Sequence, residues 1–297
     1  LEDAAGAKIA LEKSLELARS TGNLDLEARV LGSLSWSRYH ELDYRGSIEA
    51  GRAAIELARN RDRDLVNAWP HVGMAFSLLA LGEPNAASHH VEIVTTFLER
   101  MGNREPAIPG WIMYQVARLR GDFTTMSEIG EFFDQAGDAN APAWMAAGAY
   151  ACELAAPADL TSRIEAALED GLSNLRRSQR SASVAYVALA AVITGGKRTA
   201  DRAKEVASRL LSERDLMPMA ELTARVTVSL AAVVARDRDG AAQQYRRLAP
   251  LRGTVAPHPA LCMDRLLGLL AQAAGMQVEA GTHFEEALVF AGEAGFD

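Results

Sequence analysis

Three short stretches of the chain carry residue types that elsewhere bind phosphate, hold metal ions or act as nucleophiles. The first, residues 194–199, reads Thr-Gly-Gly-Lys-Arg-Thr. A phosphate-binding loop needs a glycine five positions before its Gly-Lys pair and a serine or threonine directly after the lysine. Those positions hold Ala191 and Arg198. The stretch therefore predicts a turn that ends a helix rather than a nucleotide site.

Histidine and cysteine supply the other two stretches. His89 and His90 are adjacent, so on a helix they point about 100° apart, unlike the i, i+4 pair that binds a metal ion. His258 lies near Cys262, but we find no carboxylate or second basic group to complete a nucleophilic set. We therefore predict no catalytic residue, no metal site and no cofactor, and a protein that is not an enzyme. A catalytic helical array stays a remote alternative.

Aromatic and polar residues recur at positions that would line the inner groove of stacked helical hairpins. The residues of this candidate groove, all on first helices of hairpins, are Trp36, Tyr39, His40, Trp69, Phe76, Trp111, Gln115, Arg118 and Tyr186. Trp144 begins another such helix. Tryptophan and tyrosine suit a binding site because one end is apolar and the other forms hydrogen bonds. The alternative is that these rings pack between neighbouring repeats.

The elements that would position these residues repeat about every 39 to 40 residues. Each copy has a small residue, a bulky residue four positions later and an apolar pair beyond it. The clearest copies are Ala7/Leu11/Ser14-Leu15, Ser47/Gly51/Ala54-Ile55, Ala87/Val91/Val94 and Ala280/Phe284/Ala287-Leu288. This pattern predicts an all-α fold, a right-handed α-solenoid of about seven to eight helical hairpins.

Turn signals separate the helices of each hairpin. They are Glu41-Leu42-Asp43-Tyr44, Leu81-Gly82-Glu83-Pro84, Arg120-Gly121-Asp122-Phe123 and Ala274-Gly275-Met276. Glycine suits the left-handed residue that ends a helix, and proline cannot continue one. The first helices are expected over 24–42, 65–81, 110–120, 143–155, 181–194, 219–236 and 260–274. The second helices are expected over 5–20, 45–60, 85–101, 124–136, 160–177, 200–213, 240–251 and 278–294.

The loops predict one continuous domain over residues 1–297. The segments 103–109, 138–142 and 252–259 are polar or rich in Pro and Gly, and they are short enough to join repeats rather than domains. The first expected helix has no preceding partner, and no polar capping helix follows the last. We therefore expect a fragment of a longer polypeptide.

Composition narrows the class of partner. The net charge of -8 disfavours attraction to phosphate backbones, so no nucleic acid is expected to bind this segment directly. No apolar run reaches the roughly 20 residues of a membrane span, because the longest weakly polar stretch is 184–193. Cys152 and Cys262 are too few and too far apart for a disulfide framework. A cytoplasmic protein is expected.

The chain resembles the tetratricopeptide units of large bacterial regulators. Residues 266–275 with Ala280, Phe284, 285–288 and 294–295 carry the resemblance, as do residues 10–18 with 21–23. In that family, which includes regulators of the maltose type, such arrays follow a signal-transducing NTPase and often precede a LuxR-type DNA-binding domain. Related arrays accompany nucleotide cyclases. The resemblance implies a helical binding arm, and neither the NTPase nor the DNA-binding part is present here.

These observations favour a non-catalytic domain that binds a protein or peptide, as the sensor or interaction arm of a bacterial signalling or transcription regulator. A small amphipathic ligand and other domains of the same polypeptide are further candidate partners. The alternative is a free-standing adaptor that joins two proteins. In the C-terminal half, Val226 and Leu230 form either plain core or an aliphatic docking face.

Overall fold

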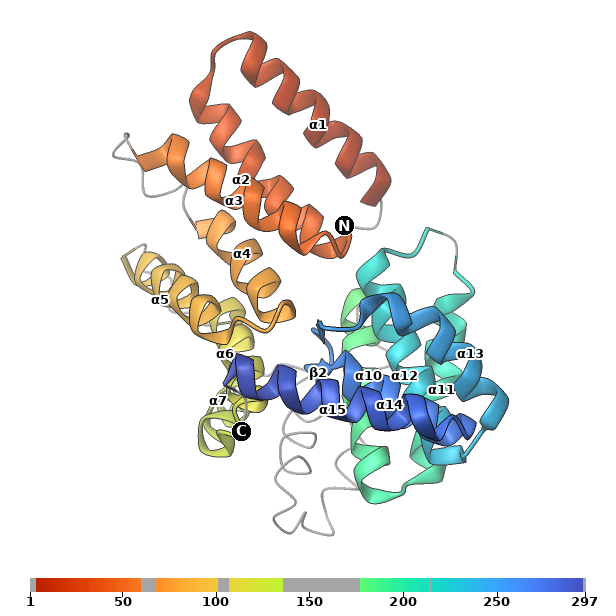
Figure 1. Ribbon diagram of the computed structural model, residues 1–297. Coiled ribbons are helices and arrows are strands. Elements are labelled where there is room, and N and C mark those ends of the chain that lie inside the picture. Colours follow the sequence, from red (N-terminus) through yellow and green to blue (C-terminus); the bar gives the residue numbers. More distant parts are fainter. Residues whose placement is uncertain (1–3, 60–67, 101–106, 136–176, 214, 296–297) are drawn as a thin grey trace. The chain divides into compact units, whose positions relative to one another are not determined.

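The computed structural model describes residues 4–59, 68–100, 107–135, 177–213 and 215–295, and almost all of their regular structure is helical (Figure 1). The all-α prediction is confirmed for this part of the chain. Its helices are α1 (Ala4–Ser20), α2 (Leu24–His40), α3 (Tyr44–Arg59), α4 (Ala68–Ala80), α5 (Pro84–Arg100), α6 (Ala107–Leu119), α7 (Phe123–Gln135), α10 (Arg177–Thr194), α11 (Lys197–Leu211), α12 (Pro218–Ala235), α13 (Arg238–Leu248), α14 (Met263–Ala274) and α15 (Gln277–Ala294).

One type of turn recurs between these helices. A residue with positive φ follows the helix, and the next residue donates its backbone N–H to the carbonyl five positions back. The seven positive-φ residues of this kind are Gly22, Leu42, Gly82, Gly121, Gly195, Arg236 and Gly275. The four turns that the sequence predicts within hairpins are therefore confirmed, as is the helix-ending turn expected within residues 194–199. Gly22 and Arg236 share the same geometry.

The spacing of these turns measures the repeat. Leu42, Gly82 and Gly121 follow one another at intervals of 40 and 39 residues, and Gly195, Arg236 and Gly275 at intervals of 41 and 39. These intervals agree with the period of 39 to 40 residues in the sequence pattern. The described helices thus form repeated helical hairpins.

The residue after several of these turns caps the next helix. The side-chain oxygens of Asp43 and Asp122 accept the backbone N–H groups of Gly46 and Thr125, and Asp237 accepts that of Gly240. Such caps satisfy a backbone donor that has no partner within the helix. A residue with positive φ therefore ends one helix, and the Asp that follows it caps the start of the next helix.

The chain divides into two compact units, which are described separately. Unit 1 comprises residues 1–113 with 217–219, and unit 2 comprises 114–216 with 220–297. In unit 1 each helix from α1 to α5 packs against the next, and α2 also packs against α4. A single array over residues 1–297 stays a prediction.

Part of the core of unit 1 lies between the two helices of one hairpin. Val30, Leu31 and Leu34 of α2 pack against Ala50 and Ala54 of α3 in one buried cluster. Ala50 and Ala54 have small side chains, which let the two helix backbones approach closely. The repeat pattern therefore corresponds to interhelical packing.

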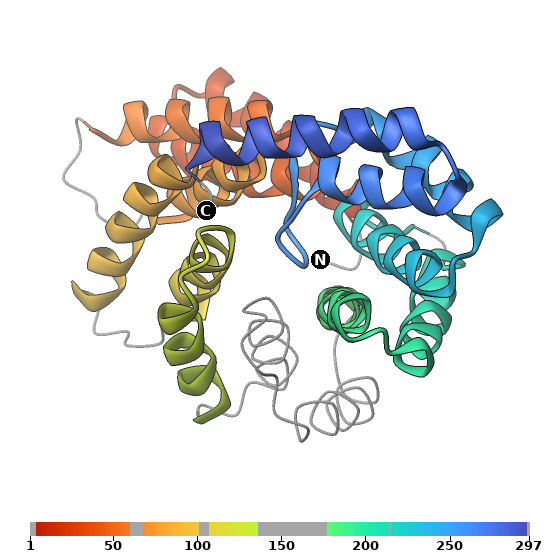
Figure 2. The same ribbon diagram turned by 60° about the horizontal axis from the view of Figure 1, so that its bottom comes forward.

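Unit 2 contains hairpins of the same kind. Ala191, Ala200 and Ala231 join α10, α11 and α12 in a buried cluster. Helices α13 and α14 pack together, and α14 and α15 lie side by side (Figures 1 and 2). Of the two alternatives for Val226 and Leu230, plain core or a docking face, the structure shows core, because both side chains are fully buried.

A small strand pair interrupts the helices of unit 2. β1 (Val255–Ala256) and β2 (Leu261–Cys262) pair antiparallel in the segment between α13 and α14. The sequence predicts only a loop before Ala260, and α14 begins at Met263 instead. Strands of two residues are too short to produce a recognisable alternation of apolar and polar residues, so the sequence pattern does not predict them.

One helix in the described part of the chain, α12, is long and apolar enough to cross a membrane by length and composition. Most of its apolar window is buried inside the protein, as it is in the core helices of many proteins. The expected helices over 143–155 and 160–177, and Trp144, lie outside the described residues. All other predicted helices are present, with ends shifted by a few residues.

Candidate ligand-binding site

Six of the nine candidate groove residues form one aromatic cluster in unit 1. Residues Trp36, Tyr39 and His40 come from α2, Trp69 and Phe76 from α4, and Trp111 from α6. The ring of Trp36 is central, with its centroid 5.6 Å from Phe76, 6.2 Å from Trp69 and 5.5 Å from Tyr39. Phe76 in turn meets Trp111 edge to face at 5.7 Å. The sequence therefore identified residues that do come together.

Burial differs sharply within this aromatic cluster. Tyr39 and Phe76 are 2% exposed, so they belong to the core. Trp36 and Trp111 are partly buried, whereas Trp69 is 52% exposed. A partner that approaches this face would meet Trp69 first, with Trp36 behind it and the buried rings as support.

His40 adds a polar group to the apolar surroundings of the cluster. Its ring packs edge-on to Trp36 at 4.5 Å. Burial lowers the pKa of His40 to about 4, so the imidazole is neutral near pH 7. Within the described residues, its buried Nδ1 has no hydrogen-bond partner. A neutral imidazole of this kind can accept or donate one bond to a ligand.

The other three candidate residues lie in unit 2. Gln115 and Arg118 belong to α6 and Tyr186 to α10. Arg118 Nε donates to the backbone oxygen of Pro259 at 2.8 Å, and burial lowers the pKa of its guanidinium. The ring of Tyr186 packs edge-on to Tyr114 at 6.4 Å. These side chains define a polar cluster with a cation inside the protein.

Two features of the polar cluster suit an acidic ligand group. In the described part of the chain, no carboxylate pairs with Arg118, and neither amide atom of the fully buried Gln115 has a hydrogen-bond partner. A guanidinium binds carboxylates and phosphates through paired N–H donors. The cluster therefore contains hydrogen-bond donors, such as the Gln115 amide N–H₂, that have no acceptor among the described residues.

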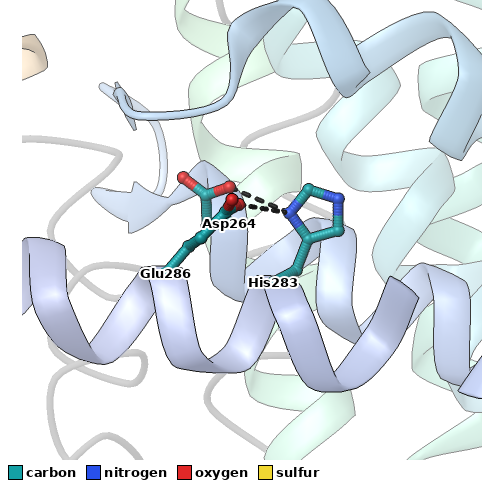
Figure 3. Close-up of side chains that lie close together, drawn as sticks. All are labelled: Asp264, His283 and Glu286. Carbon is teal, nitrogen blue, oxygen red and sulfur yellow. Dashed lines mark hydrogen bonds and ion pairs between the residues drawn. The ribbon is translucent and has the colours of Figure 1, made fainter. Parts of the chain in front are cut away.

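The structure also assembles a carboxylate–histidine cluster that the sequence pattern does not predict. Asp264 of α14 faces His283 of α15, and Glu286 lies one turn beyond His283 (Figure 3). Asp264 is two residues after Cys262, yet it contacts His283 rather than His258. The available signal was the His-x-x-Glu spacing on α15, which places both side chains on one helix face.

A histidine pair was missed as well. His71 of α4 lies 2.7 Å from His90 of α5, measured between their Nδ1 atoms. Burial and the neighbouring imidazole lower the pKa of His71 to about 4. In the sequence, His90 stands beside His89, but its hydrogen-bond partner in the structure is His71.

A search of protein-family models and of curated proteins finds no match for this chain. The described fold alone defines the class, which is an all-α protein built from repeated helical hairpins.

Proposed function

We propose that this chain is a non-catalytic tetratricopeptide-like solenoid that binds a protein or peptide through the aromatic cluster of unit 1. The observation that carries the proposal is Trp69, a large aromatic side chain 52% exposed beside the half-buried Trp36. Exposed tryptophan backed by other rings is typical of the residues that dominate binding energy. The neutral His40 supplies a polar contact in the same cluster.

The repeat geometry supports this class of function. Each helical hairpin buries its apolar face only against its neighbours, so an array presents an extended surface. Small rotations between hairpins add along such an array, which gives a physical route from binding to a signal. This route suits the sensor arm of a bacterial cytoplasmic regulator, as the resemblance to maltose-type regulators implies. A free-standing adaptor is the alternative, and it differs by having no output domain.

A peptide library displayed on phage tests the proposal while the natural partner is still unidentified. The full chain is used for selection, and the affinities of selected peptides are measured by calorimetry. We expect peptides with aromatic or aliphatic anchors, whose affinity falls at least tenfold on Trp69→Ala. Leu288→Ala is the control, because Leu288 is 75% exposed on α15, outside the cluster.

Circular dichroism must show that both variants keep their helices. Selected peptides that bind Trp69→Ala and the parent chain equally would refute the aromatic cluster as the site. Hydrolysis of ATP or of a cyclic nucleotide by the purified chain would overturn the assignment as a non-enzyme. The length of the natural polypeptide separates a regulator from an adaptor.

A further inference from the structure

The carboxylate–histidine cluster joins the last two helices of the described chain. His283 Nδ1 lies 3.0 Å from Asp264 Oδ1 and 3.2 Å from Glu286 Oε2 (Figure 3). The three atoms lie within 4.8 Å of one another. One nitrogen and two carboxylate oxygens thus converge on one point between α14 and α15.

Outer hydrogen bonds hold two of these side chains in place. The backbone N–H of Gly253 donates to Asp264 Oδ2 at 2.6 Å, which leaves Oδ1 directed at His283. The other ring nitrogen of His283, Nε2, lies 3.1 Å from the Tyr245 hydroxyl. When Nε2 carries the proton and donates it to Tyr245, Nδ1 presents a lone pair to the cluster. Histidine ligands of metal ions are usually fixed in this way through their second nitrogen.

Hydrogen bonding alone accounts poorly for the second carboxylate. Nδ1 of an imidazole carries at most one proton, and buried Asp264 is the nearer acceptor. Glu286 brings a further negative charge to the same nitrogen, although its side chain is 43% exposed and could turn to solvent. A cation at the point of convergence would compensate both carboxylates.

The separations fit the edges of a coordination shell. Two ligand atoms that each lie about 2.0–2.2 Å from a metal ion, at angles of 90–110°, are about 3.0–3.5 Å apart. Both measured separations from His283 Nδ1 fall in this range. The ligand set of one imidazole and two carboxylates suits Zn²⁺ and similar transition metals, whereas Ca²⁺ and Mg²⁺ prefer oxygen alone.

We propose that Asp264, His283 and Glu286 bind one divalent transition-metal ion, with Zn²⁺ as the representative ion. Glu286 provides access from solvent because its side chain is half exposed, while the other two ligands are buried. The ion ties α14 to α15, and its three protein ligands leave room for water or for a donor atom of a partner.

Zinc titration of the full chain by calorimetry tests the proposal. We expect Glu286→Gln to lose one equivalent of Zn²⁺ or to bind it at least tenfold more weakly. Glu285→Gln is the matched control, because Glu285 is the exposed neighbour on α15. Asp264→Asn is a second variant, since its carbonyl oxygen can still accept from Gly253 while an amide NH2 replaces the carboxylate oxygen that faces His283. Melting temperatures without metal show whether each variant is folded.

The histidine pair of α4 and α5 could bind zinc independently, so the titration is repeated on His90→Gln. The proposed site predicts that this variant keeps the equivalent that Glu286→Gln loses. Co²⁺ provides a second readout, because its visible absorption reports the ligands directly. Equal Zn²⁺ stoichiometry and affinity for the parent, Glu286→Gln and Asp264→Asn would overturn the proposal.

Discussion

His71 and His90 place their Nδ1 atoms 2.7 Å apart across the hairpin of α4 and α5. The two residues are 19 positions apart, and the same separation joins Asp264 to His283 across the hairpin of α14 and α15. Equal spacing in two hairpins indicates that residues i and i+19 meet at equivalent places in the repeat. Polar pairs occupy that place in both.

The histidine pair predicts a loss of stability in mild acid. Burial, with neighbouring positive charge, lowers the pKa values of His71 and His90 to about 4, below the ordinary 6.5. Their contribution is therefore complete above pH 6.5 and is lost as the pH falls from 6.5 towards 4. At pH 5 the cost is at most about 2 kcal/mol for His71, and less for the more accessible His90.

Melting temperatures at pH 7.5 and pH 5 measure this loss. The double variant His71→Gln/His90→Gln should show a smaller decrease between the two pH values than the parent. The exposed His89 and Arg52 also lower the pKa of His90, so the comparison variant His89→Gln should lose only a small part of the decrease. An unchanged decrease in the double variant would contradict the assignment.

The aromatic cluster predicts a large stability cost for truncating one of its rings and a small cost for another. Phe76→Ala should lower the free energy of unfolding by about 3–5 kcal/mol, because Phe76 is 2% exposed and leaves a cavity. Trp69→Ala should cost about 1 kcal/mol or less, because half of that side chain already faces solvent. Denaturant unfolding measures both values. A similar large cost for both would place Trp69 in the core.

The helices could be predicted from sequence because their boundaries depend on local chemistry. Gly82, Gly121 and Gly275 adopt the positive φ that glycine tolerates, and Asp caps follow several such turns. Leu42 and Arg236 adopt the same conformation without being glycine. The turn at Leu42 could be predicted from its place in the repeat rather than from residue type. The turn at Arg236 was not predicted, because arginine gives no turn signal.

The candidate sites were only partly predictable. First-helix positions identified the rings of Trp36, Trp69 and Phe76, since the helical period fixes which side chains share a face. The pairing of Asp264 with His283 depends on how two helices pack, and side-chain periodicity within one helix does not contain that information. Burial of Gln115 likewise follows from tertiary packing.

The buried amide of Gln115 predicts that the polar cluster lowers the stability of the protein. That amide is fully buried, and neither polar atom has a hydrogen-bond partner within the described residues. Gln115→Leu should therefore raise the free energy of unfolding by about 1–3 kcal/mol, because it removes that desolvation penalty. Thermal unfolding measures the change, and the exposed Gln272→Leu should alter it by about 0.5 kcal/mol or less. A destabilised Gln115→Leu would show that the amide has a partner after all.

Two glycines test whether close helix packing sets the repeat. A Cβ on Gly73 of α4 would lie 2.9 Å from the carbonyl carbon of Ser35 and 3.0 Å from the backbone nitrogen of Trp36. Backbone atoms cannot turn aside, so Gly73→Ala should push α4 from α2 and cost about 1–3 kcal/mol. Gly281 of α15 has no atom within 4 Å of such a Cβ.

Gly281→Ala should instead stabilise the protein by about 0.5–1 kcal/mol, because alanine favours a helix interior over glycine. Urea unfolding of both variants gives the two free energies, and the same substitution should change them in opposite directions. Since Gly73 lies against Trp36, its variant should also disturb the aromatic cluster and shift tryptophan fluorescence, whereas Gly281→Ala should leave the emission unchanged. Equal stabilisation by both substitutions would mean that α2 and α4 are not in close contact at this point.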